Sequence, residues 1–130
     1  MAHVIGAKWV KAHALSNKKL GVTGFCWGGG TANFIAAAMG ADLQAAAPFY
    51  GAAAASESVP NIKAPILAHL AENDERINAM YPGFEEALKK AGVRYEVQVY
   101  PGTQHGFHNN STPRYDEAAA KLAWDRTIAH

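Results

Sequence analysis

A short apolar run that ends abruptly at a cysteine between glycines most constrains how this chain can fold. The run 20–25 is followed by Cys26, with Gly24 and Gly28 two positions to either side. This glycine-x-nucleophile-x-glycine spacing is typical of a strand that turns at once into a helix, where the turning residue has strained backbone angles and its neighbours need to lack a Cβ. Cys26 would then point out of the sheet above a helix N-terminus, whose N–H groups favour a thiolate or an oxyanion.

Two alternatives for this glycine-rich stretch stay open. Strand–turn–helix junctions of this kind also bind phosphates, but glycines at 24, 28, 29 and 30 do not give the G-x-G-x-x-G spacing, and the P-loop lysine is missing. A single cysteine is also often a small buried core residue, and the turn would then be only structural. We favour a nucleophile at Cys26.

Length and composition limit the classes of protein that fit. The 130 residues suffice for one domain with a single core, and 49% apolar with 18% charged residues indicates a folded chain. A net charge of +1 without a basic run argues against nucleic acid or an anionic membrane surface as partner. The apolar stretches are shorter than a membrane span, a signal-peptide core is not visible, and one cysteine cannot form an internal disulfide. We therefore expect a cytoplasmic protein.

Hydrophobic patterning predicts alternating helices and strands. Unbroken apolar runs favour strands buried on both faces, as in a parallel sheet, and the alternation in the last strand favours an edge position. The expected strands are 20–25, 43–50, 66–71 and 93–100. The expected helices are 3–15, 28–39, 77–91 and a last one that begins at Thr112-Pro113, with threonine as N-cap and proline in the first turn. Right-handed crossovers would then give a three-layer α/β/α unit with four parallel strands.

Three loops at the carboxyl ends of the expected strands carry reactive side chains. Cys26 follows the first strand, Asp74 the third and His105 the fourth. Functional groups gather at this edge of a parallel sheet, and the order nucleophile, acid, histidine is that of elbow-type hydrolases. The imidazole would take the thiol proton and pass it to the leaving group, while the carboxylate would fix the imidazole's tautomer. The backbone N–H of Trp27 would help to bind the oxyanion.

Neighbouring residues compete for two of these roles. Glu72 and Glu75 are alternatives to Asp74, which we favour because its shorter side chain lies farther past the strand than Glu72. His108 is an alternative to His105, which we favour because it follows the strand directly and precedes a glycine. A surface position or the edge of the substrate site is then expected for His108.

The other histidines give no sign of a metal site. His69 lies in the middle of the third expected strand and is predicted to be a hydrogen-bonded core residue. The spacing of cysteine and histidine residues matches no metal-binding motif.

These motifs resemble the dienelactone hydrolase (carboxymethylenebutenolidase) family. The resemblance covers essentially all 130 residues and is carried by 24–30, 48–51, 73–74 and 105–107. It is specific, because a cysteine elbow is rare among α/β-hydrolases. It implies a truncated α/β-hydrolase fold and a hydrolase of small esters or lactones that needs no cofactor, with a triad of Cys26, Asp74 and His105.

The resemblance also suggests residues that contact the substrate. Tyr50 and Trp27 look like walls of a pocket, with core packing as the competing interpretation, and Phe107 is expected at the substrate. The typical family member has an arginine shortly after the histidine that holds a substrate carboxylate. That neighbourhood here reads Gly-Phe-His-Asn over 106–109, so we expect another lactone or ester at least as readily as dienelactone.

Family members are longer, and residues 1–130 resemble only their C-terminal part, as a single truncated domain. The remaining half would supply further strands, the second oxyanion donor, and an acidic residue and an arginine that contact the cysteine. Strand 20–25 then becomes an exposed apolar edge, so we expect a homo-oligomer, a two-fold dimer, that buries it. The alternative to an enzyme is a catalytically inactive truncated homologue that acts as a self-associating module.

Overall fold

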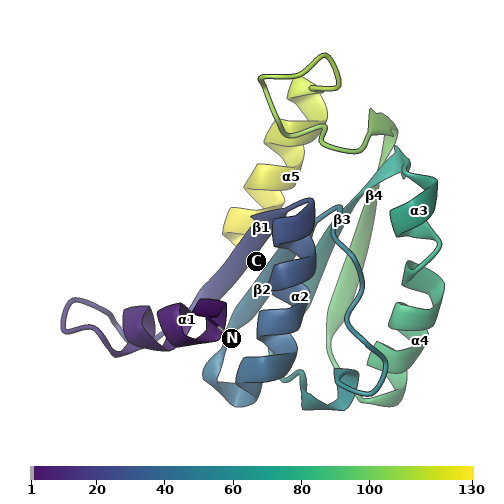
Figure 1. Ribbon diagram of the computed structural model, residues 1–130. Helices are drawn as coiled ribbons and strands as arrows, with labels where there is room; N and C mark the ends of the chain where they lie inside the picture. Colours follow the sequence, from purple (N-terminus) through teal and green to yellow (C-terminus); the bar gives the residue numbers. More distant parts are fainter. Residues whose placement is uncertain (1) are drawn as a thin grey trace.

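The computed structural model describes residues 2–130 and shows a sheet with helices on both faces (Figure 1). The strands are β1 (Gly21–Phe25), β2 (Ala45–Phe49), β3 (Ile66–Asn73) and β4 (Tyr95–Gln104). The helices are α1 (Ala2–Ala12), α2 (Trp27–Met39), α3 (Glu75–Asn78), α4 (Tyr81–Lys90) and α5 (Glu117–Ala129), with short 3-10 turns at Gly40–Asp42 and Val59–Asn61. Within residues 2–130, every helix is too short or too polar to span a membrane.

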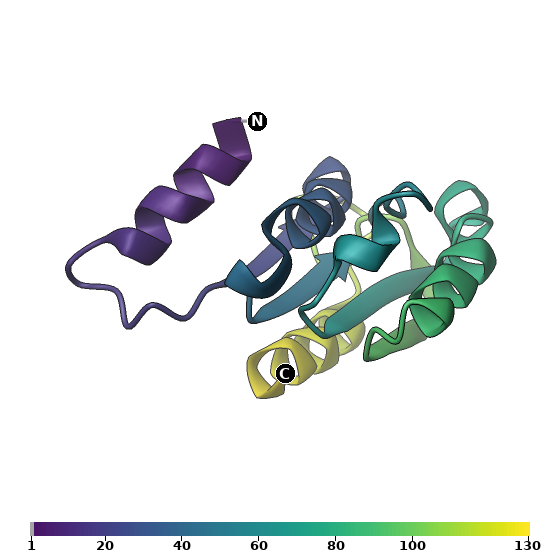
Figure 2. The same cartoon turned by 90° about the horizontal axis from the view of Figure 1, so that it is seen from below.

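The four strands lie in the order β1-β2-β3-β4, and each neighbouring pair is parallel. Helices α2, α3 and α4 cover one face, and α5 covers the other (Figure 2). The predicted four-stranded parallel sheet in three layers is therefore confirmed, and β4 lies at an edge as its alternating sequence predicted. Among residues 2–130, the opposite edge is β1, which pairs with β2.

Two groups of buried side chains hold the layers together. The larger group lies between the sheet and the α2–α4 layer and includes Ile35, Leu70 and Leu88. The smaller group lies between the sheet and α5, and its aromatic members are Phe49, Tyr50, Tyr100 and Phe107. Burial of apolar surface on both faces explains why β2 and β3 carry almost unbroken apolar sequences.

His69 is a core residue, as predicted. It is fully buried, its Nδ1 lies 2.8 Å from the Tyr100 hydroxyl and its Nε2 lies 2.9 Å from Thr127 Oγ1. Because Thr127 belongs to α5, the second bond ties that helix to β3, while the first joins β3 to β4. Burial, assisted by the positive charge of Arg126, lowers the pKa of His69 to about 4, so its imidazole is neutral in the folded chain at pH 7.

Several predicted boundaries differ from the structure by a few residues, and three of these differences change the course of a helix or strand. The strand expected at 93–100 continues to Gln104, and a register shift opposite 71–73 accommodates Pro101 and Gly102. The helix expected at 77–91 is divided into α3 and α4, with Pro82 in the first turn of α4. The last helix does not begin at Thr112-Pro113, because Asp116 is its N-cap and accepts a hydrogen bond from the Ala119 N–H at 2.9 Å.

Candidate active site

Cys26 occupies a sharp turn between β1 and α2. Its φ of 55° and ψ of −120° lie in a region that residues other than glycine rarely adopt. The turn is held by backbone hydrogen bonds, since the Cys26 N–H donates to the Phe49 carbonyl at 3.1 Å and the Cys26 carbonyl accepts from Gly29 at 2.9 Å. The cysteine therefore stands at the carboxyl end of β1 in the strained strand–turn–helix conformation that the sequence predicted.

Glycines allow the backbone of α2 to approach the sheet this closely. A Cβ on Gly24 would lie 2.2 Å from the Gly28 carbonyl oxygen, and one on Gly29 would lie 2.5 Å from the Phe49 carbonyl oxygen. Gly51, just past β2, meets the backbone of Gly29 and leaves no space for a side chain either. The turn thus depends on glycines at 24, 29 and 51, whereas a Cβ on Gly28 would meet open space.

Asp74 and His105 are joined by a short hydrogen bond. Asp74 Oδ2 lies 2.5 Å from His105 Nδ1, and the aspartate side chain is 8% exposed. Of the competing acids, Glu72 accepts from the Gly102 N–H at 2.6 Å, and Glu75 is exposed on α3. Since the carboxylate engages Nδ1, Nε2 is the imidazole nitrogen left for proton transfer.

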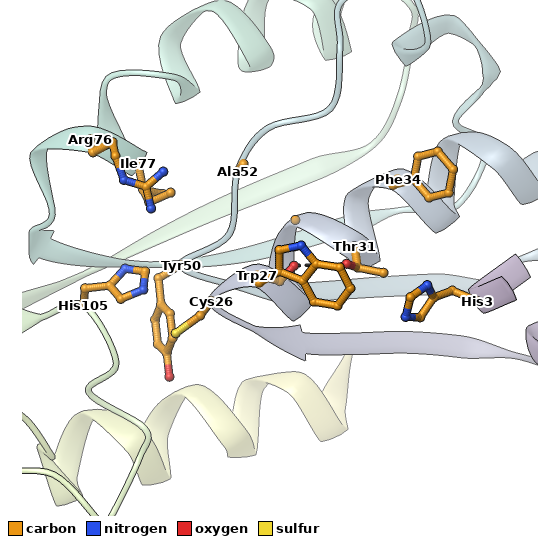
Figure 3. A pocket seen from close by; sticks show the side chains of 11 residues that line it. His3, Cys26, Trp27, Thr31, Phe34, Tyr50, Ala52, Arg76, Ile77 and His105 are labelled. Carbon is orange, nitrogen blue, oxygen red and sulfur yellow. Dashed lines mark hydrogen bonds between the residues drawn. The ribbon is translucent and has the colours of Figure 1, made fainter. Parts of the chain in front are cut away.

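Cys26 and His105 line a common cavity of about 520 Å³ (Figure 3). The figure shows the sulfur directed toward the Tyr50 ring, with the His105 imidazole on the same side of the cavity. Within residues 2–130, no hydrogen bond joins Cys26 Sγ to His105. Further lining residues come from α1, α2, the loop after β2 and α3: His3, Trp27, Gly30, Thr31, Phe34, Ala52, Arg76 and Ile77.

Opposing influences act on the Cys26 thiol. Cys26 is exposed as a residue, but neighbouring protein atoms partly shield its sulfur from water. This partial burial raises the pKa of the Cys26 thiol. The Arg114 guanidinium lowers this pKa, and the Asp74 carboxylate raises it. Because the net direction is upward, the resting cysteine is a thiol, and a base has to remove its proton before it can act as a nucleophile.

The remaining predicted residues divide between the cavity and the core. Trp27 is 75% exposed on the cavity wall, and its N–H is at the first position of α2, where helices leave N–H groups without an intrahelical acceptor. Tyr50 both lines the cavity and packs in the core, and burial raises the pKa of its hydroxyl to about 12. Phe107 does not reach the cavity, which corrects the expected substrate contact: it is fully buried among aromatic core residues. His108 stacks on Phe25, with ring centroids 4.9 Å apart.

Arg114 is the charged residue that the sequence analysis missed. Its guanidinium packs over Gly106, where a Cβ would lie 3.7 Å from Arg114 Nη2. The loop folds back because the Asp116 N–H donates to the Phe107 carbonyl at 2.9 Å. An arginine therefore lies beside the histidine loop although none follows His105 closely in the sequence, and no local pattern could have located it.

Comparisons with known proteins identify related sequences. The sequence profile described as "Dienelactone hydrolase family" matches residues 4–130. Protein usf of Aquifex pyrophilus is 38% identical over 117 residues, which cover 88% of this chain and 51% of that protein. A protein of Aquifex aeolicus named "Putative carboxymethylenebutenolidase" is 37% identical over 114 residues, covering 85% of this chain and 49% of its own length.

Solved structures show the same relationship. A crystal structure from Klebsiella pneumoniae named "Putative Dienelactone Hydrolase" superposes with a TM-score of 0.85 at 29% identity, over 95% of this chain and 56% of the other. The chain thus spans about half the length of the curated relatives it matches. With the profile match over nearly its whole length, the chain belongs to the dienelactone hydrolase family.

Proposed function

We propose that this chain hydrolyses small esters or lactones through Cys26, with His105 as general base and acid and Asp74 as the residue that orients His105. The observation that carries the proposal is the 2.5 Å hydrogen bond between Asp74 Oδ2 and His105 Nδ1, beside a cysteine at the elbow. Family membership supports hydrolase chemistry. The identity of the nucleophile and the class of substrate are part of the proposal.

The first half of the reaction forms a thioester. His105 Nε2 takes the proton from Cys26 Sγ as the sulfur attacks the carbonyl carbon of the ester, and the carbonyl oxygen becomes an oxyanion. The Trp27 N–H is the oxyanion donor that this chain offers, and the nearby Arg114 charge favours both the thiolate and the oxyanion. Collapse of the intermediate breaks the C–O bond, and His105 returns the proton to the leaving alkoxide.

The second half releases the acid and restores the thiol. His105 Nε2 takes a proton from a water molecule, which attacks the thioester carbon, and the departing Cys26 sulfur is protonated in turn. Asp74 keeps Nδ1 protonated throughout, so that Nε2 is free to accept and donate. Since Sγ and the imidazole are not hydrogen-bonded to each other within residues 2–130, binding of the substrate has to bring them together.

Hydrolysis of p-nitrophenyl acetate tests the proposal. Cys26→Ala is expected to reduce the rate to that of the buffer, and His105→Asn to lower kcat by at least about a hundredfold. Since Cys26 is the single cysteine, any acetyl group bound as a thioester is located by mass spectrometry of the intact chain. A burst of p-nitrophenolate equal to the enzyme concentration would accompany that adduct if release of the acid is the slow step.

Matched variants separate the proposed residues from their neighbours. His108→Asn is the control for His105→Asn, because His108 stacks on Phe25 and does not line the Cys26 cavity. Glu72→Gln is the control for an Asp74→Asn change, which is expected to lower kcat by at least about tenfold. Full activity in a folded Cys26→Ala variant would refute the choice of nucleophile. A folded wild-type chain without turnover would favour the inactive, self-associating alternative.

A further inference from the structure

Tyr50 adopts a strained backbone conformation immediately after β2. Its φ is 36°, and of residues 2–130 only Lys18, Cys26 and Tyr50 combine a positive φ with a side chain. In the β1–β2 ladder Phe25 pairs with Phe49, so Cys26 and Tyr50 leave adjacent strands at the same level of the sheet. Backbone strain persists only where the surrounding structure imposes it, and it gathers at functional sites. The strain at Cys26 belongs to the elbow, whereas the strain at Tyr50 needs an explanation of its own.

The backbone at Tyr50 is fixed by its neighbours on both sides. The Tyr50 N–H donates to the His69 carbonyl at 2.7 Å, and a Cβ on Gly51 would lie 2.2 Å from the Gly29 carbonyl carbon. The chain therefore has to bend at position 50 to bring Gly51 against α2. Glycine would adopt this bend without strain. A tyrosine at this position must therefore make side-chain contacts that offset the strain.

The Tyr50 ring lies beside both side chains of the proposed proton transfer. The ring centroids of Tyr50 and His105 are 4.9 Å apart, with the planes inclined by 57°, which is within the range of favourable aromatic pairs. Figure 3 shows the Cys26 sulfur directed toward the same ring. Tyr50 is 1% exposed and also packs on Phe107, at a centroid distance of 5.4 Å. The ring is therefore a fixed surface beside the nucleophile and the base.

The His105 imidazole needs such a surface. Its Nδ1 bonds to Asp74 Oδ2 at 2.5 Å, but among the residues that the structure describes its Nε2 has no hydrogen-bond partner. The χ2 torsion of a histidine is broad, so a bond at one nitrogen leaves the imidazole plane free to tilt. Contact with the Tyr50 ring limits this tilt, and it thereby limits the direction in which Nε2 points.

The Tyr50 hydroxyl does not exchange protons at neutral pH. Burial raises the pKa of this hydroxyl to about 12, and negative charge on Cys26 acts in the same direction. The phenol therefore keeps its proton while the cysteine loses its own. What Tyr50 offers to His105 is the ring itself, which a phenylalanine would also provide and an aliphatic side chain would not.

We propose that Tyr50 is a positioning residue, whose ring holds the His105 imidazole in the plane from which Nε2 reaches Cys26 Sγ. The strained backbone after β2 brings the ring to this place. The inference rests on the proposed function for its kinetic consequence. It differs from two simpler roles of a buried aromatic residue, since a residue that only packs in the core would affect stability alone, and a wall of the substrate pocket would affect KM.

Kinetics with p-nitrophenyl acetate separate these roles. Tyr50→Phe keeps the ring and should have a kcat within about twofold of wild type, whereas Tyr50→Leu should lower kcat at least about tenfold and change KM less than about twofold. Tyr100→Leu is the matched control, because Tyr100 is buried in the same aromatic group but does not line the Cys26 cavity. It should lower stability and leave kcat unchanged. If Tyr50→Leu does not fold, Tyr50→Met replaces it, because methionine fills irregular core space.

Proton NMR provides a readout that needs no turnover. The Nδ1 proton in the short bond to Asp74 is expected as a low-field resonance, identified by its absence from His105→Asn. It should persist in Tyr50→Phe and Tyr100→Leu, and exchange with water should broaden it in Tyr50→Leu. A folded wild-type chain that follows this pattern without turnover would refute the proposed function and support the positioning role. Loss of kcat in Tyr50→Phe, or full kcat with an unchanged resonance in Tyr50→Leu, would overturn the positioning role.

Discussion

Substitution by alanine should have opposite effects on the free energy of unfolding at two adjacent glycines of α2. A Cβ on Gly28 meets nothing within 4 Å, whereas one on Gly29 lies 2.5 Å from the Phe49 oxygen and 2.9 Å from the Gly51 Cα. Alanine at 28 is expected to raise the free energy of unfolding by about 0.5–1 kcal/mol, because it restricts the unfolded chain and suits a helix. Alanine at 29 has the same favourable effect on the unfolded chain. Its Cβ, however, would clash with backbone atoms that no rotamer change can move, and this overpacking costs about 3 kcal/mol. The net loss at 29 is therefore about 2 kcal/mol, and the two variants differ by about 3 kcal/mol.

Urea unfolding followed by circular dichroism measures this difference directly. With an m-value of about 1–3 kcal/mol/M, the two midpoints should lie about 1–3 M apart, and the m-values should agree with wild type. Protein concentration has to be the same throughout, because dimerisation would add to the apparent stability. Equal midpoints for Gly28→Ala and Gly29→Ala would refute the claim that α2 and the end of β2 meet at backbone contact.

Three further predictions concern charged and polar groups outside the elbow. Because folding lowers the pKa of His69 from about 6.5 to about 4, the unfolded chain binds more protons between these values, so stability should fall by about 3 kcal/mol as the pH drops from 6.5 to 4. Urea titrations at several pH values test this, and His69→Gln should flatten the dependence. Arg114→Gln should raise the pKa of Cys26 further, which the pH dependence of iodoacetamide labelling reports. Asp116→Ala should cost about 1 kcal/mol through loss of the α5 N-cap, and a thermal melt with an unchanged midpoint would contradict it.

The sequence predicted those parts of the fold that depend on local pattern. The elbow at Cys26 and the parallel sheet follow from glycine spacing and unbroken apolar runs, both of which act through neighbours in the chain. The proximity of Asp74 and His105 could also be predicted from the sequence, because the two residues follow adjacent strands of a parallel sheet. Residues that are far apart in the sequence become neighbours when they follow adjacent parallel strands, because the carboxyl ends of these strands lie at the same edge of the sheet.

The loop after β4 could not be predicted in this way. Thr112-Pro113 has a sequence typical of a helix start, yet the Asp116 N–H bonds to the Phe107 carbonyl and the helix begins only after it. The same bond brings Arg114 back over Gly106, which is a tertiary contact without a local signature. The family resemblance suggested Phe107 as a substrate contact, but Phe107 is instead buried against Tyr50, which follows β2, and Tyr100 of β4.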